Sequence, residues 1–179
     1  MKFALLSFLS MFILTNACFD YPAQEFERQG ISFTCPSGWK LTDLMEFGPM
    51  GGQVTAEKAG YGASGLVIIS WFNFDIDPDS SIEGLEEGLS TGLLRLRKCK
   101  FSEIEDYQLG GFPARRKTYN GQLLGQKIVG ELIGFSEKER TITIAIQENV
   151  EDIDENRLGF QELMASILVG ENPVEKDKI

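Results

Sequence analysis

The sequence predicts an α+β domain built on a mostly antiparallel β-sheet. Two segments have apolar residues at helical spacing, and several others alternate or run apolar as strands do. The strands come in consecutive groups joined by turn residues, which favours antiparallel pairing. Segment 66–74 is apolar on both faces, so we expect a central strand covered by helices on both sides. This arrangement would be a three-layer α/β/α sandwich.

The first strands are expected near the start of the domain. Ile31, Phe33 and Cys35 alternate with polar residues, which indicates a half-buried strand. Residues 47–52 form a glycine-rich loop, and 53–58 are expected to be a second strand. No Lys-Ser pair or helix follows the loop, so we interpret it as structural and not as a phosphate-binding loop.

The clearest helix follows an acidic turn after residue 74. Its apolar residues recur at spacings of three and four, so they share one face: Ile82, Leu85, Leu89, Leu93 and Leu96. Ser80 or Ser81 is expected to cap its start. Cations occupy its expected end, where the helix dipole favours them: Arg95, Arg97 and Lys98.

Strands and a second helix follow. The segments expected to be strands are 101–109, 114–119, 122–135 and 141–147. Asn120-Gly121 is a strong signal for a type I′ hairpin turn, and 136–139 is expected to turn the chain again. The second helix is amphipathic, with Asp152 or Asp154 as its cap; its apolar residues are Ile153, Leu158, Phe160, Leu163 and Ile167.

Residues 1–17 have the layout of a signal peptide, with a positive start, an apolar core over 3–14 and small residues before Cys18. The core is too short to span a bilayer as a transmembrane helix. A cysteine directly after Ala17 is similar to the lipobox of bacterial lipoproteins, where that cysteine receives the lipid and becomes the first mature residue. Thr15 stands where that box usually has an aliphatic residue. The alternative is cleavage after Ala17 by an ordinary signal peptidase.

The remaining boundaries follow from composition. Residues 18–29 are polar and predict a tether, 30–169 are expected to fold, and 170–179 are expected to be a flexible tail. This organisation predicts a protein of the bacterial cell envelope, periplasmic or surface-facing, held to the membrane by an N-terminal lipid on Cys18.

The charge balance is acidic, with 17 Lys and Arg against 27 Asp and Glu and a net charge of −10. Removal of the signal takes only Lys2, which leaves 16 against 27, or −11. Such a surface repels phosphate backbones, so nucleic acid is not an expected partner.

The sequence contains no histidine. The commonest general base and zinc ligand are therefore missing, and Ser-His-Asp or Cys-His hydrolysis cannot be built from this chain alone. Carboxylate-only chemistry, as in glycosidases, stays open. No cofactor is expected.

Lipidation of Cys18 would leave Cys35 and Cys99 as the only thiols. In an oxidising compartment these two could form a disulfide that closes a long loop. The alternative is that Cys35, in an alternating strand, is a small buried hydrophobic residue.

Several short motifs resemble the Mog1/PsbP-like family, which includes many bacterial lipoproteins. They are the segment Gly30–Trp39 (GISFTCPSGW), the acidic entry to the helix near Ser80, Leu109–Ala114 (LGGFPA) and Phe160–Leu168 (FQELMASIL). The similarity spans about residues 30–168. It implies a binding and assembly module and not a catalyst. Plant and cyanobacterial members associate with photosystem II and the yeast member binds a small GTPase, but no residues here match a known contact set.

Two charged clusters could bind a ligand. Counted as a calcium-binding EF-hand loop, the acidic segment 75–86 has ligands at positions one, three, five and twelve: Asp75, Asp77, Asp79 and Glu86. Ser80 replaces the glycine required at position six, and the alternative is a solvated acidic turn at a helix N-terminus.

The basic cluster Arg115, Arg116 and Lys117 could contact an anionic ligand or partner. The alternative is ion pairing with Glu131 or Glu139 on neighbouring strands.

The sequence thus favours an exported, lipid-anchored, non-enzymatic binding or assembly domain of the cell envelope, whose partner is a protein or an envelope component. One alternative is a ligand- or calcium-binding domain that uses residues 75–86. A second is a carboxylate-dependent envelope hydrolase.

Overall fold

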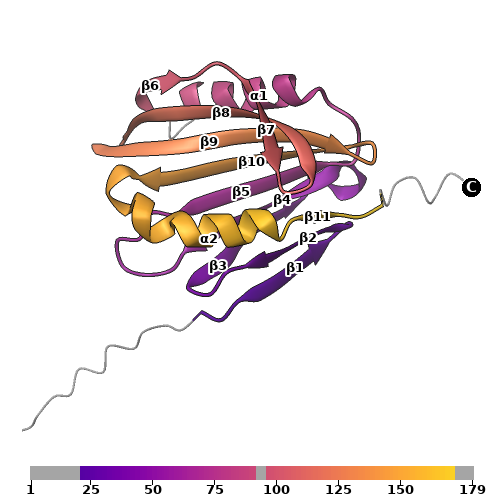
Figure 1. The fold of residues 1–179 in the computed structure, drawn as a ribbon, viewed down its shortest axis with the longest axis horizontal. Coiled ribbons are helices and arrows are strands. Elements are labelled where there is room, and N and C mark those ends of the chain that lie inside the picture. Colours follow the sequence, from indigo (N-terminus) through magenta and orange to yellow (C-terminus); the bar gives the residue numbers. More distant parts are fainter. Residues whose placement is uncertain (1–20, 92–95, 172–179) are drawn as a thin grey trace, which may run out of the picture.

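The computed structural model describes residues 21–91 and 96–171, and Figure 1 shows their arrangement. The strands are β1 (Gln24–Arg28), β2 (Ile31–Cys35), β3 (Trp39–Glu46), β4 (Gly51–Lys58), β5 (Leu66–Phe72), β6 (Arg97–Phe101), β7 (Glu105–Leu109), β8 (Phe112–Leu123), β9 (Gln126–Glu137), β10 (Arg140–Asn149) and β11 (Leu168–Val169). The helices are α1 (Pro78–Thr91) and α2 (Ile153–Ala165), with short 3-10 turns at η1 (Gly48–Met50) and η2 (Val150–Asp152).

A large sheet has the strand order β3-β4-β5-β10-β9-β8-β6, and β7 also pairs with β8. A small sheet has the order β1-β2-β11. Every strand pairing within the described ranges is antiparallel. The predicted α+β class with a mostly antiparallel sheet is therefore confirmed. Strand β5 lies between β4 and β10, as its apolar residues on both faces predict.

The two faces of the large sheet bury different cores. On one face, Ile142, Ile144 and other residues pack with α2 and the small sheet, and Trp39 contacts Phe160 with 5.1 Å between ring centroids. On the other face α1 lies against β8, β9 and β10, where a second core forms from Ile82, Leu96, Tyr119, Ile128 and Leu132. Helix α2 packs against β2 and β10, so it leaves β8 and β9 uncovered on its face.

Part of the expected tether is a strand. β1 lies inside residues 18–29 and pairs with β2, where Phe26 stands opposite Phe33 and stacks on it at 4.8 Å. The sequence pattern does not predict β1, because Phe26 is the one apolar residue of this polar strand and a single residue cannot show the alternation of a strand. Its ring is nevertheless buried in the main core.

The predicted hairpin turn at Asn120-Gly121 is wrong by four residues. β8 continues to Leu123, and the turn lies at Leu124-Gly125, with φ of 50° and 91°. Gly121 instead allows β6 to lie close to β8, because a Cβ at this position would be 3.3 Å from the backbone oxygen of Arg97 on β6. The turn expected at 136–139 is present at its last residues, where Lys138 and Glu139 both have positive φ.

The first helix does not extend to Leu96, although its apolar spacing predicts that it does. α1 is described as far as Thr91, and Leu96 lies outside the helix, immediately before β6, where it packs on the second core. Arg97 and Lys98 belong to β6 and not to a helix end. The predicted strand 101–109 is divided between β6 and β7.

Residues 1–17, Cys18, Leu93, Arg95 and most of the expected tail lie outside the described residues. No helix within the described ranges is long and apolar enough to cross a membrane.

Candidate functional site

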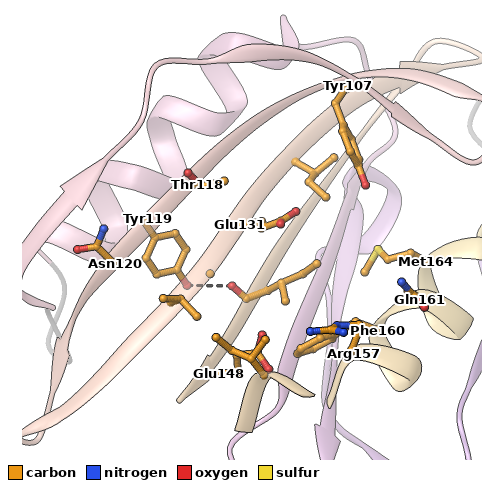
Figure 2. Close-up of a pocket in the computed structure, with 15 residues that line it drawn as sticks. Tyr107, Thr118, Tyr119, Asn120, Glu131, Glu148, Arg157, Phe160, Gln161 and Met164 are labelled. Carbon is orange, nitrogen blue, oxygen red and sulfur yellow. Dashed lines mark hydrogen bonds between the residues drawn. The ribbon is translucent and has the colours of Figure 1, made fainter. Parts of the chain in front are cut away.

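A groove with a volume of about 610 Å³ lies beside α2, on the part of the sheet that this helix leaves uncovered (Figure 2). One face of α2 forms its wall: Ile153, Arg157, Phe160, Gln161 and Met164. The floor comes from β8, β9 and β10: Thr118, Tyr119, Asn120, Val129, Gly130, Glu131, Ile133, Ile146 and Glu148. Tyr107 of β7 lies at the end opposite Glu148. These fifteen residues are called the groove below.

The groove is mostly apolar and contains few charges. Strand alternation directs Val129, Ile133 and Ile146 to the same face as the carboxylates Glu131 and Glu148. Glu131 stands opposite Ile146 and Glu148 opposite Val129, so the two carboxylates are diagonal neighbours on adjacent strands. An apolar surface with a few placed polar groups is the usual composition of a ligand site.

Glu148 is the groove carboxylic acid whose pKa the structure shifts. Burial raises the pKa of its carboxyl above the ordinary value, and the carboxylates of Asp152 and Glu131 raise it further. Two groups act in the opposite direction. Asn156 donates a hydrogen bond from Nδ2 to Oε2 at 3.1 Å, and the positive charge of Arg157 favours the ionised form. Glu148 therefore gains a proton at a higher pH than an exposed glutamate does.

Tyr119 holds the floor of the groove together across three strands. Its hydroxyl donates a hydrogen bond to the backbone oxygen of Ile146 at 3.0 Å, shown as a dashed line in Figure 2. Gly130 makes room for this bond, because a Cβ there would lie 2.1 Å from that oxygen and 2.4 Å from Cζ of Tyr119. Burial raises the pKa of Tyr119, so the hydroxyl stays a donor.

The predicted basic cluster is divided between the two faces of the sheet. Arg116 lies near the groove, where it pairs with Glu105 at 2.6 Å and Glu131 at 3.7 Å and its Cζ is 4.5 Å from the Tyr107 ring centroid. On the opposite face Arg115 pairs with Asp79 and Asp106, and Lys117 pairs with Glu86. The ion-pair interpretation is therefore confirmed, with Glu131 as one of the expected partners.

The acidic segment 75–86 does not converge on one point. Asp75 accepts a hydrogen bond from Ser136 Oγ at 2.8 Å, while Asp79 and Glu86 face cations of β8. Asp77 precedes α1 and accepts from the backbone N–H of Ser80 at 2.9 Å, which lowers its pKa. Asp77 therefore caps the helix, where the sequence predicts Ser80 or Ser81.

Within the described residues, no group of three or more His, Cys, Asp or Glu could hold a metal ion. The four carboxylates considered as alternative calcium ligands contact protein groups in different places, because α1 begins at Pro78 and directs the later positions toward β8.

Cys35 and Cys99 are both free and do not meet. Cys35 is buried in the main core, where burial raises its pKa to about 11, and Cys99 on β6 packs against the second core across the sheet. The structure thus contains no bond between these two cysteines, and Cys35 lies among buried hydrophobic side chains. Cys18, the expected lipidation site, lies outside the described residues.

The residues that line the groove are mostly not predicted from the sequence. Glu131 is expected only as an ion-pair partner, and Glu148 and Arg157 are not expected at a site. One signal is available: Glu131 interrupts the apolar run of its strand, which is unusual for a residue facing a core.

No family model and no curated protein matches the sequence. Solved structures match its fold. Cyanobacterial PsbP from Synechocystis has a TM-score of 0.57 at 12% identity, covering 82% of this chain and 92% of that one. The Saccharomyces cerevisiae Ran-binding protein Mog1p has a TM-score of 0.54 at 12% identity, covering 84% and 97%. LpqN, involved in cell envelope biogenesis of Mycobacterium tuberculosis, has a TM-score of 0.50 at 14% identity, covering 83% and 91%.

These matches show that the chain is an α+β protein whose fold is similar to that of all three proteins. More particularly, the chain has the Mog1/PsbP-like fold.

Proposed function

We propose that this protein is an exported, lipid-anchored binding domain of the cell envelope, without catalytic activity, which takes up part of its partner in the groove beside α2. The observation that carries the proposal is the groove itself. Its volume of about 610 Å³ falls within the range of about 300–1,000 Å³ that is usual for ligand sites. We also infer a three-layer α/β/α arrangement, in which the small sheet shares one outer layer with α2.

Export and anchoring are supported by the sequence before the domain. Residues 1–17 have the layout of a signal peptide, and Cys18 stands three residues before Tyr21, where the described structure begins. LpqN, which has a similar fold, is itself involved in envelope biogenesis. Since fold alone does not fix function, the anchor needs a direct test.

The anchor is tested by metabolic labelling with radioactive palmitate. The wild-type protein is expected to incorporate the label and Cys18→Ala to lose it. An unlabelled wild-type protein that is released from membranes in soluble form would remove the anchor from the proposal.

The groove is tested by photo-crosslinking in native membranes. Gln161 lines the groove and Leu158 does not, although both lie on α2 and are exposed. We expect a benzophenone amino acid at Gln161 to give one discrete adduct that the same probe at Leu158 does not give. Adducts from Leu158 alone, or none from Gln161, would contradict binding in the groove.

The second candidate is carboxylate-dependent hydrolysis, which one observation favours. Glu131 and Glu148 are diagonal neighbours in the groove, and a raised pKa on one of two acids is the pattern of a general acid beside an ionised partner. Hydrolysis of envelope polysaccharide by the wild type, and its loss in Glu148→Gln, would favour this function. Equal activity of the two proteins at background level would exclude it.

A further inference from the structure

We propose that the end of the domain nearest the lipid anchor docks on an anionic bilayer through two exposed apolar loop tips and an adjoining cluster of unpaired cations. The proposal rests on the proposed lipid anchor. It adds a contact surface and an orientation that lipidation alone does not provide.

Strand register places three chain segments at this end of the sheet. β5 begins at Leu66 opposite Gln147 and ends at Phe72 opposite Thr141, so the β4–β5 loop lies at the end where β10 finishes. The β8–β9 turn lies at the same end, because Asn149 stands opposite Ile128. The turn between β9 and β10 lies at the other end, and Figure 1 shows the two ends at left and right. The end with the β4–β5 loop and the β8–β9 turn is called the anchor end below.

The N-terminal segment joins the domain at the anchor end. Tyr21 accepts hydrogen bonds from the backbone N–H of Gly38 at 2.8 Å and from Ser37 Oγ at 3.2 Å. Gly38 in turn accepts from the N–H of Ala59, at the start of the β4–β5 loop, at 2.9 Å. Cys18 lies three residues before Tyr21, which is about 10 Å of fully extended chain. A lipid on Cys18 would therefore hold the anchor end close to the bilayer.

Two apolar side chains project from the loops of this end. Tyr61 is 109% exposed and Leu124 is 92% exposed, more than any other large apolar residue in the described ranges. Tyr61 lies between Gly60 and Gly62, and Leu124 occupies a turn position with φ of 50°, which Asn or Gly would adopt at lower cost. Tyrosine and leucine at the tips of loops are suited to the interfacial region of a bilayer.

Exposed cations lie on β6 and at the start of β9, the strands next to the end of β8 that leads to Leu124: Arg97, Lys98, Lys100 and Lys127. The register brings them together, since Arg97 pairs with Gln122 and Gln122 pairs with Lys127. None of the four forms a salt bridge with another described residue. On a chain with a net charge of −10, four unpaired cations beside an apolar tip complement an anionic lipid surface.

Acidic residues near this end have partners within the domain. Asp154 in the first turn of α2 pairs with Arg157, and Asp152 in η2 accepts a hydrogen bond from Ser64 Oγ of the β4–β5 loop. The cations of β6 and β9 lie opposite Asn120 and Gln122 of β8, so they share the groove face of the sheet, at the edge away from β5. The domain would therefore rest end-on, on the two tips and the β6–β9 edge.

The test uses the full lipidated chain in vesicles of phosphatidylcholine with about one third phosphatidylglycerol, which supplies the anionic surface. Cys99→Ser is combined with Tyr61→Cys, Leu124→Cys or Glu139→Cys, and each new thiol receives an environment-sensitive fluorophore. Cys35 is buried and stays unlabelled, and Glu139 provides an exposed control in the turn between β9 and β10. We expect spin-labelled lipids to quench the fluorophore at 61 and 124 but not at 139. Equal quenching at all three positions, or quenching at 139 alone, would overturn the proposal.

The contribution of charge to docking is tested by two double variants, each of which removes two positive charges. Arg97→Gln with Lys127→Gln changes the unpaired cluster, and Arg28→Gln with Lys138→Gln changes paired cations elsewhere. Removal of each cluster cation is expected to lower the docking constant about fivefold, as for a basic residue near an anionic membrane. An equal effect of both double variants would overturn the charge argument. Flotation of the wild-type protein with vesicles tests the lipid anchor separately. If the protein floats with the vesicles but the fluorophores at 61 and 124 are not quenched, the docking surface is refuted and the anchor is not.

Discussion

Replacement of Gly130 by alanine is expected to lower the free energy of unfolding, because the added methyl group does not fit between the strands that form the floor of the groove. The added Cβ would lie 2.1 Å from the backbone oxygen of Ile146 and 2.4 and 2.5 Å from Cζ and Oη of Tyr119. Neither neighbour can move freely, because the oxygen belongs to a central strand and the Tyr119 ring is buried in the second core. The strands must separate locally, or Tyr119 must leave its site.

The magnitude follows from these two effects. Overpacking a well-packed core costs about 1–3 kcal/mol, and loss of the hydrogen bond from Tyr119 to Ile146 adds about 1 kcal/mol. The free energy of unfolding is therefore expected to fall by about 2–4 kcal/mol in Gly130→Ala. With a urea dependence of about 2 kcal/mol per molar, the midpoint of unfolding falls by about 1–2 M.

The assay is urea unfolding followed by fluorescence of the buried Trp39 and Trp71. Gly111→Ala is the matched control, since a Cβ at Gly111 meets no atom within 4 Å. In a Tyr119→Phe background the Gly130→Ala change is expected to cost less, because the displaced hydroxyl is already absent. A midpoint for Gly130→Ala that equals that of Gly111→Ala would refute the packing argument.

Three further outcomes are expected. Because burial raises the pKa of Glu148 above the ordinary value of 4.5, its carboxyl binds more protons in the native state than in the unfolded state, and the free energy of unfolding falls as the pH rises above 4.5. Glu148→Gln is expected to raise the urea midpoint at pH 7 and to make it depend less on pH. A pH profile of the urea midpoint parallel to that of the wild type would contradict this prediction. Cys99 is expected to react with a thiol reagent before Cys35, which is buried with a pKa raised to about 11, and simultaneous reaction in the native protein would contradict their placement. Arg140 is 0% exposed, its guanidinium nitrogens have no hydrogen-bond partner among the described residues, and burial lowers its pKa. Arg140→Met is expected to leave the urea midpoint unchanged or raise it, and a clear loss of stability would indicate a partner for this charge.

Elements with strong local signals were predictable. The apolar run at 66–74 predicts a central strand, and β5 lies inside the sheet. The alternation of Ile31, Phe33 and Cys35 predicts β2, whose three apolar side chains are all buried. In both cases the pattern of apolar residues in the sequence matches the pattern of buried side chains.

Features that depend on distant contacts were not predictable. Asn120-Gly121 has the residue types of a turn, but Gly121 is needed where β6 approaches β8, so the turn forms at Leu124-Gly125. β1 is recognisable only once Phe26 meets Phe33 and the core. Tertiary packing decides between local alternatives at both places.

The candidate site also depends on contacts between residues that are distant in the sequence, so it was not predictable. Glu131 and Glu148 lie 17 positions apart in the chain and meet because β9 and β10 pair in a particular register. The groove also needs α2 to cover β10 and leave β8 and β9 open, which no local pattern specifies. The acidic segment 75–86 has the more obvious sequence signal, yet its carboxylates cap a helix and pair with cations.

The central claim is that a partner occupies the groove, and one measurement tests it directly. The photo-crosslinking probe at Gln161 is combined with Thr118→Trp, which places a large side chain on the opposite side of the groove. We expect the discrete adduct at Gln161 to disappear in this variant, while palmitate labelling and the urea midpoint stay as in the probe-bearing protein with Thr118. An adduct of the same mass and yield after Thr118→Trp would contradict binding in the groove.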